Sequence, residues 1–185
     1  LDQFATGLVG TRSPYGEVKN ALDPELISGG SSSGSAVSVA LGMASFSLGT
    51  DTAGSGRVPA ALNGLVGYKP SLGAWSTKGV VPACASLDCV TVFANSLEDA
   101  EEVNFAARGV DEECCWSREY EEPLQKLPQK ICLAKDGVTF YGPYADIYRA
   151  KWEQAKRRIE DMGITVEYID YTMFSKAASI LYDGP

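Results

Sequence analysis

Two glycine- and serine-rich segments constrain the fold of this chain more than any other feature. Residues 29–35 read Gly-Gly-Ser-Ser-Ser-Gly-Ser, and residues 49–60 read Gly-Thr-Asp-Thr-Ala-Gly-Ser-Gly-Arg-Val-Pro-Ala. Glycine has no Cβ, so such segments allow tight turns and close approach of the backbone to its neighbours. The sequence has no histidine, so a serine nucleophile here cannot use an imidazole base. The two segments therefore indicate serine chemistry that depends on another base.

Ser55 is the candidate nucleophile. Gly54 and Gly56 flank it, and the lack of side chains on both sides allows a sharp turn that presents the hydroxyl. From these three residues alone, a flexible turn with no catalytic role is the alternative interpretation.

Backbone groups around Ser55 are candidates for an oxyanion hole, because consecutive N–H groups can point into one concavity and stabilise a developing negative charge. Asp51 and Arg57 flank the turn. A carboxylate and a guanidinium at these positions are suited to supporting the loop by charge-assisted hydrogen bonds, and we expect a similar role for Ser86 and Asp88. The predicted N–H donors are those of Thr52, Ala53, Gly54 and Ser55.

Several motifs together resemble the amidase signature family. They occur in the family's order and at similar spacing: the two segments above, Gly-Tyr-Lys-Pro at 67–70 and Ser-Leu-Asp at 86–88. Within that family, residues 2–16, 81–84 and 181–185 resemble allophanate hydrolases, which also occur as the hydrolase part of urea amidolyase.

The resemblance implies a Ser-cisSer-Lys triad. Ser55 matches the nucleophile, and Ser31 matches the bridging serine, which follows a cis peptide bond and relays the proton to a lysine; Ser32 would support it by hydrogen bonding. The family's lysine lies upstream of the Gly/Ser segment, and neither Lys19 nor Lys69 matches it. We therefore expect the chain to be an internal fragment, truncated at both ends and inactive by itself. The alternative for residues 29–35 is a flexible linker.

The resemblance also implies a substrate-binding residue near the end of the chain. Allophanate hydrolases have a Leu-Tyr-Glu-Gly-Pro segment whose tyrosine contacts the carboxylate end of the substrate, and an arginine further along completes that site. Tyr182 matches this tyrosine, while Asp183 stands where glutamate is usual. The alternative for Tyr182 is an aromatic side chain that packs on the core at a helix end.

These residues lead to a functional hypothesis. The full protein would hydrolyse the small amide allophanate to ammonia and carbon dioxide in urea degradation, without a metal or an organic cofactor. It would be fused to or paired with a biotin-dependent urea carboxylase, and it could form a homodimer. The alternatives are a general amidase, an amidotransferase subunit that acts on charged tRNA, a non-catalytic domain whose Gly/Ser loop binds an anion, or a pseudoenzyme of the same family.

Composition excludes several other classes. The net charge is −8, the pI is near 4.6, and Lys and Arg are scattered along the sequence. The chain therefore lacks the clustered basic residues that bind nucleic acid. No apolar run approaches the roughly 18 residues of a membrane span. Five cysteines without a Cys-x-x-Cys pair or histidine favour reduced thiols over a disulfide framework or zinc site, and so a cytoplasmic protein.

Hydrophobic patterning predicts an α/β fold with a mixed, largely parallel central sheet covered by helices, in one domain that spans 1–185. A Glu-, Pro- and Gln-rich stretch at 111–129 reads as an exposed connection. The predicted strands are 45–49, 65–68, 87–94, 131–134 and 164–169, and the predicted helices are 35–44, 58–62, 96–108, 143–162 and 172–182.

Overall fold

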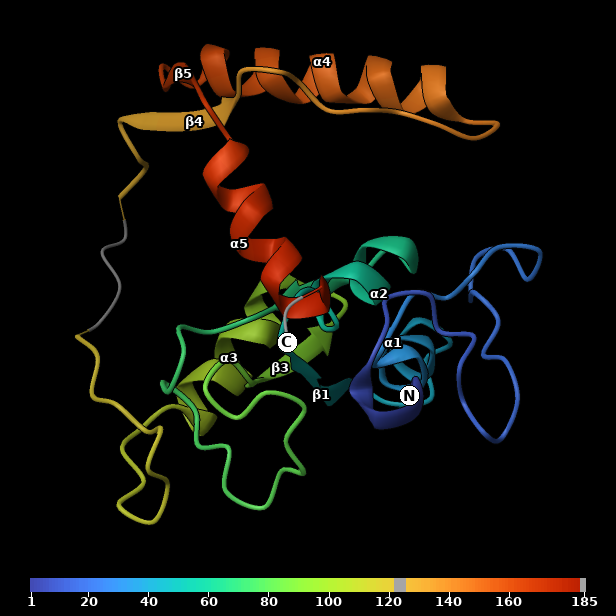
Figure 1. The fold of residues 1–185 in the computed structure, drawn as a ribbon, viewed down its shortest axis with the longest axis vertical. Coiled ribbons are helices and arrows are strands. Elements are labelled where there is room, and N and C mark those ends of the chain that lie inside the picture. Colours follow the sequence, from blue (N-terminus) through green and yellow to red (C-terminus); the bar gives the residue numbers. More distant parts are fainter. Residues whose placement is uncertain (122–125, 184–185) are drawn as a thin grey trace. The chain divides into compact units, whose positions relative to one another are not determined.

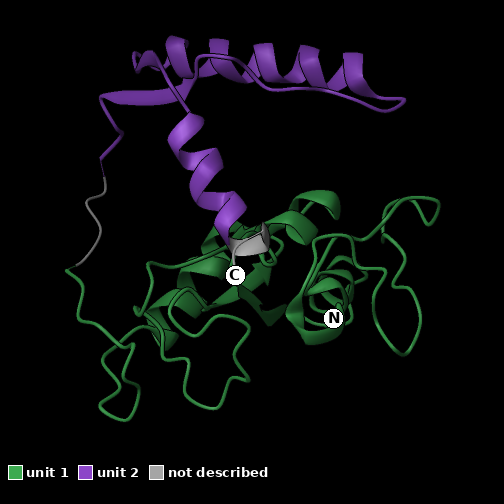
Figure 2. Ribbon diagram, in the orientation of Figure 1, with its two compact units in different colours: residues 1–121 green, residues 122–185 purple. Residues whose placement is uncertain are grey.

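A computed structural model describes residues 1–121 and 126–183 of the chain. The chain divides into two compact units, residues 1–121 and residues 122–185 (Figure 2). The expectation of a single domain over 1–185 stays a prediction.

The first unit contains a three-stranded sheet in the order β1-β3-β2. The central strand β3 is antiparallel to both neighbours, so Asp51 of β1 pairs with Cys89 and Tyr68 of β2 pairs with Val92. A short 3-10 helix, Gln3–Ala5, precedes the sheet. The strands are β1 (Phe46–Asp51), β2 (Val66–Tyr68) and β3 (Cys89–Ala94), and the helices are α1 (Ser33–Ala40), α2 (Arg57–Leu62) and α3 (Leu97–Ala107) (Figure 1).

This topology confirms the α/β class but corrects the pairing that we predicted for the main sheet. β1 and β2 run in the same direction and are joined by α2, as the alternation of strand and helix suggested. However, β3 lies between them and makes every pairing in this sheet antiparallel. Residues 69–88 connect β2 to β3 without a helix, and strands joined without a crossover helix can pair antiparallel.

Helices cover β3 on both faces of the sheet, and the successive side chains of the strand point alternately to these two faces. α1 and α2 cover the face that carries Phe93, whereas α3 covers the face that carries Val92. The first hydrophobic cluster comprises Ala36, Val39, Ala60 and Phe93, and the second comprises Trp75, Val92, Ala94 and Ala100.

The start of α3 follows the sequence signal. Ser96 is its N-cap, and the Ser96 hydroxyl accepts a hydrogen bond of 3.1 Å from the backbone N–H of Asp99. Glu98 and Asp99 lie in the first turn, where negative charge is favourable. The predicted helix at 96–108 is therefore confirmed.

The second unit contains a parallel strand pair, β4 (Lys130–Ala134) and β5 (Thr165–Ile169), connected through α4 (Ala145–Asp161). The helix α5 (Thr172–Asp183) follows β5. This unit supplies the parallel pairing, so the described residues carry both kinds of pairing, in two separate sheets.

The predicted connection at 111–129 has no helix or strand in its described residues, 111–121 and 126–129. Most of these side chains are exposed, but Cys114 is buried. Tyr120 is also anchored, since its hydroxyl donates a 2.7 Å hydrogen bond to the carbonyl of Leu72. Within the part of the chain that the structure describes, no helix is both long and apolar enough to span a membrane.

Candidate functional site

Ser31 lies two residues before α1 and is fully buried. The peptide bond between Gly30 and Ser31 is cis, which is the geometry that the resemblance implies for the bridging serine. The next peptide group, between Ser31 and Ser32, is held at both ends. Its carbonyl accepts a 2.8 Å hydrogen bond from the N–H of Asp2, and its N–H donates a 3.4 Å bond to the carbonyl of Ser55. One peptide group therefore joins the two serine segments.

The carboxylate of Asp51 closes the loop that carries Ser55. Asp51 ends β1 and is fully buried. Its oxygens accept bonds from the N–H groups of Gly54 at 2.8 Å, Gly56 at 3.2 Å and Arg57 at 3.2 Å. The guanidinium of Arg57 adds two bonds of 2.9 Å each. These are the charge-assisted contacts that the sequence predicts for a supporting pair.

Burial and hydrogen bonding act in opposite directions on Asp51. Burial is the largest influence and raises the pKa of the carboxyl, since it disfavours the charged form. The bonds from Arg57 and from the N–H groups of Gly54 and Gly56, with the charge of Arg57, outweigh burial and leave the pKa of Asp51 below its ordinary value. The same contact raises the pKa of Arg57. Asp51 is therefore ionised at neutral pH.

One of the four predicted oxyanion donors has a protein partner in the structure. The N–H of Gly54 donates to Asp51 at 2.8 Å, and the four-donor oxyanion hole stays a prediction. Within the described ranges, the N–H groups of Thr52, Ala53 and Ser55 make no hydrogen bond and remain available as donors.

Asp88 supports the same loop from the other side. It is 4% exposed, and it accepts a hydrogen bond from the hydroxyl of Thr52. Its carboxylate also accepts the N–H groups of Ala83 and Cys84, at 2.9 and 3.1 Å. The other residue for which we expected such contacts, Ser86, is exposed, and its side chain lies 3.8 Å from the sulfur of Cys84.

Ser32 ties the first serine segment to the sheet. Its hydroxyl donates to the carbonyl of Thr50 at 3.2 Å and accepts the N–H of the same residue at 3.1 Å. A close contact lies on the far side of the Ser55 loop, where a Cβ on Gly56 would stand 2.6 Å from Oγ1 of buried Thr91. Only glycine fits at position 56 without a shift of the Thr91 side chain.

The hydroxyl of Ser31 has no hydrogen-bond partner among the described residues. It therefore makes no bond to Ser55, which is 6% exposed. Neither lysine near these segments reaches it: Lys19 pairs with Glu17 at 2.8 Å, and Nζ of Lys69 donates to the carbonyl of Pro70 at 3.0 Å. The arrangement thus supplies two serines, three N–H donors and a supporting carboxylate. The Ser31 hydroxyl, like those of Ser33 and Thr91, is buried without a partner among the described residues.

Tyr182 lies in α5, but its side chain lies outside the described residues. Its predicted contact with the substrate stays a prediction. In the described part of the chain, no group of three or more Cys, Asp or Glu side chains could hold a metal ion.

Sequence reasoning missed Asp2, whose backbone N–H holds the carbonyl of Ser31. Asp2 is fully buried, and its carboxylate accepts the N–H groups of Gly10 at 3.0 Å and Arg12 at 2.8 Å. The glycines that follow Asp2 were the only available signal, because they allow the backbone to fold back around a side chain.

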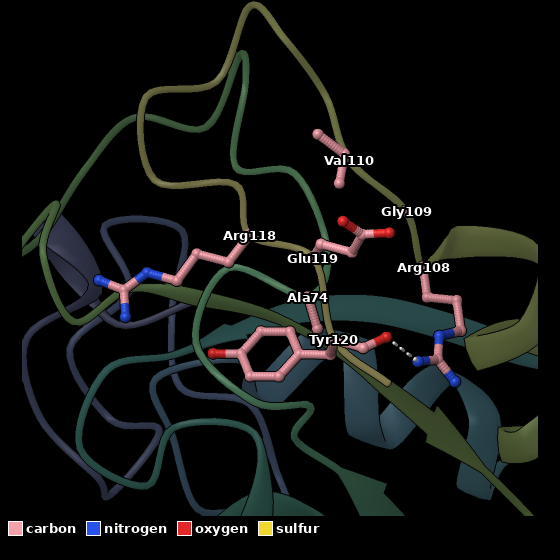
Figure 3. Close-up of a pocket in the computed structure, with 7 residues that line it drawn as sticks. All are labelled: Ala74, Arg108, Gly109, Val110, Arg118, Glu119 and Tyr120. Atoms are coloured by element: carbon pink, nitrogen blue, oxygen red, sulfur yellow. Dashed lines mark hydrogen bonds between the residues drawn. The ribbon is translucent and has the colours of Figure 1, made fainter. Parts of the chain in front are cut away.

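A separate pocket of about 210 Å³ is lined by Ala74, by residues 108–110, which follow α3, and by residues 118–120 (Figure 3). The guanidinium of Arg108 there donates to the carbonyls of Tyr120 at 3.2 Å and Glu121 at 3.3 Å. Figure 3 shows that Arg118 points away from Arg108, so the two cations do not converge on one ligand. No residue of the serine site lines this pocket.

Sequence comparison finds curated relatives that align with nearly the whole of this chain. The chain is 46% identical to urea amidolyase of Saccharomyces cerevisiae over 187 residues, covering all of this chain and 10% of that protein. It is 37% identical to a glutamyl-tRNA(Gln) amidotransferase subunit from Symbiobacterium thermophilum, covering 98% of this chain and 38% of that relative.

Among solved structures, Kluyveromyces lactis allophanate hydrolase superposes with a TM-score of 0.90 at 45% identity, covering 99% of this chain and 30% of that one. The chain thus spans between about a tenth and two fifths of these relatives. The Amidase family model matches residues 1–184. This chain therefore belongs to the amidase family.

Proposed function

We propose that the full-length protein hydrolyses allophanate, with Ser55 as the nucleophile and Ser31 as the group that relays its proton. The observation that carries this proposal is the single peptide group that bonds to Asp2 at one end and to Ser55 at the other. It holds the bridging serine and the nucleophile in adjacent segments. The likeness to urea amidolyase and allophanate hydrolase supports the choice of substrate.

The chemistry follows from these groups. Ser55 Oγ attacks the amide carbon while its proton passes to Ser31 and from there to a base outside this chain. The carbonyl oxygen becomes an oxyanion, and the free N–H groups of Thr52, Ala53 and Ser55 are the donors available to stabilise it. The C–N bond then breaks, ammonia leaves with the returned proton, and water releases the acyl group from Ser55. Tyr182 would bind the carboxylate of the substrate.

The match to urea amidolyase over only 10% of that protein supports a fusion to, or pairing with, a urea carboxylase part. We include that partner in the proposal. The homodimer and the cytoplasmic location stay predictions.

The test is ammonia release from allophanate by the full-length protein, compared with its Ser55→Ala variant. We expect the variant to lose at least about a thousandfold in rate, since the remaining donors and binding groups cannot replace a nucleophile. Acetamide serves as the control substrate. Hydrolysis of acetamide but not of allophanate would identify a general amidase.

A second candidate is an amidotransferase component, because the match to the amidotransferase relative covers 98% of the chain. Glutamine hydrolysis by the full-length protein, without turnover of allophanate, would favour this candidate. Ser55→Ala should abolish either activity, so the nucleophile and the substrate are tested separately.

A further inference from the structure

Asp2 is a buried carboxylate that no cation of the described residues pairs with. A buried charge is costly unless hydrogen bonds compensate it. Here the compensation comes from the backbone N–H groups of Gly10 and Arg12, at 3.0 and 2.8 Å. The carboxylate thereby folds residues 2–12 into a closed loop.

This loop holds the chain on both sides of Ser31. The N–H of Asp2 donates to the carbonyl of Ser31 at 2.8 Å, and the N–H of Gly30 donates to the carbonyl of Leu8 at 2.9 Å. The N–H of Ser32, in the same peptide group as the Ser31 carbonyl, continues to Ser55. The hydrogen bonds therefore run without a break from Asp2 to the nucleophile segment.

The packing beside Ser31 leaves no free space next to Gly30. A Cβ on Gly30 would overlap Oδ2 of Asp2 and the backbone nitrogen of Gly10. The carboxylate thus lies directly against the backbone that precedes Ser31.

From these contacts we infer that Asp2 is a positioning residue, which aligns Ser31 with Ser55 for proton transfer. The inference rests on the proposed roles of the two serines. Asp2 acts through the Ser31–Ser32 peptide group and makes no hydrogen bond to the Ser55 side chain in the described residues, so we expect substrate binding not to depend on it directly.

The test uses Asp2→Asn in the full-length protein. Asparagine has nearly the same shape, but one of its two terminal groups is a donor, so either Gly10 or Arg12 loses its acceptor. We expect kcat for allophanate to fall about 10- to 100-fold, the size of effect that a small misplacement of reacting groups produces, with KM unchanged within about twofold. Labelling of Ser55 by a fluorophosphonate probe should slow by a similar factor.

The control is Asp136→Asn, which makes the same chemical change at an exposed position and should leave both rates unchanged. Each rate is divided by the concentration of folded protein, and the midpoint of thermal unfolding is measured for each variant. A residue that only stabilises the fold would lower the midpoint without changing the rate per folded molecule. If Asp2→Asn does not fold, Asp2→Glu, which keeps the charge but moves it by one methylene, is measured against the same expectations.

The outcomes separate this inference from the proposed function. Wild-type rates of turnover and labelling in the Asp2 variant overturn the role of Asp2 alone. A full-length protein that is labelled at Ser55 but does not turn over allophanate overturns the substrate, and slower labelling of the Asp2 variant then still supports positioning. If wild-type protein is not labelled at Ser55, both proposals fail.

Discussion

Asp51 accepts five hydrogen bonds around the Ser55 loop, and its lowered pKa gives those bonds a pH dependence. A depressed pKa stabilises the fold above the unfolded value of about 3.9, and that stability is lost as pH falls through the folded pKa. We expect Asp51→Asn to destabilise the chain by about 2 kcal/mol at pH 7. The difference should shrink below about pH 4. Urea unfolding of both proteins from pH 7 to pH 3 measures it, and a difference that is constant over this range would contradict the prediction.

Gly56 is the second residue that limits the loop, because β3 leaves no space for a side chain there. A Cβ would stand 2.6 Å from Oγ1 and 2.9 Å from Cγ2 of Thr91, which is fully buried. We expect Gly56→Ala to cost about 1–3 kcal/mol through overpacking, and to reduce activity in the full-length protein because the residue adjoins Ser55.

The matched control is Gly34→Ala in α1, where nothing lies within 4 Å of the added Cβ. In a helix that change should be neutral or stabilise by up to about 1 kcal/mol. Thermal unfolding of the two variants gives the comparison. Equal midpoints would mean that Thr91 moves aside and that the contact is not limiting.

At this scale the sequence predicts groups but not the directions in which they point. Asp51 and Arg57 could be assigned a supporting role because they flank the turn. The bond from the N–H of Gly54 to Asp51 could not be predicted, because it depends on where the Asp51 carboxylate lies in the folded chain. Asp2 could not be found, since it is 29 positions before Ser31 and only the tertiary fold brings the two together.

Among the elements, β3 organises the first unit, because both of its neighbours bond to it and both of its faces are covered. Phe93, at 0% exposure, is its largest fully buried side chain. We expect Phe93→Ala to destabilise the chain by about 3–5 kcal/mol. Phe105→Ala in α3, where the side chain is 80% exposed, should change stability by less than about 0.5 kcal/mol. Urea denaturation midpoints test the pair, and similar losses for both would contradict the assignment of the core.

The elements themselves were predictable, because amphipathic periodicity and capping residues are local. The Ser96 cap fixed the start of α3, and the predicted helix at 172–182 differs from α5 only at its last residue. The order of the strands was not predictable in the same way. No feature of residues 87–94 themselves indicates that this strand lies between β1 and β2. Its position depends on which strand edges are still unpaired when residues 87–94 join the sheet.

For the whole molecule, the arrangement around Ser31 decides whether the 185-residue chain can act alone. A serine hydroxyl ionises far above neutral pH and needs a base to become a nucleophile. The Ser31 hydroxyl has no partner in the described residues, and Lys19 and Lys69 are engaged by Glu17 and by the Pro70 carbonyl.

We therefore expect the 185-residue chain to release ammonia from allophanate no faster than its own Ser55→Ala variant, and at least about a hundredfold more slowly than the full-length protein, which is the usual contribution of a positioned base. Parallel assays of the three proteins measure this. Turnover by the short chain that Ser55→Ala removes would mean that the base lies within these residues. Lys19→Met and Lys69→Met would then show which lysine leaves its present partner to bind Ser31, because only the variant of that lysine would lose the activity.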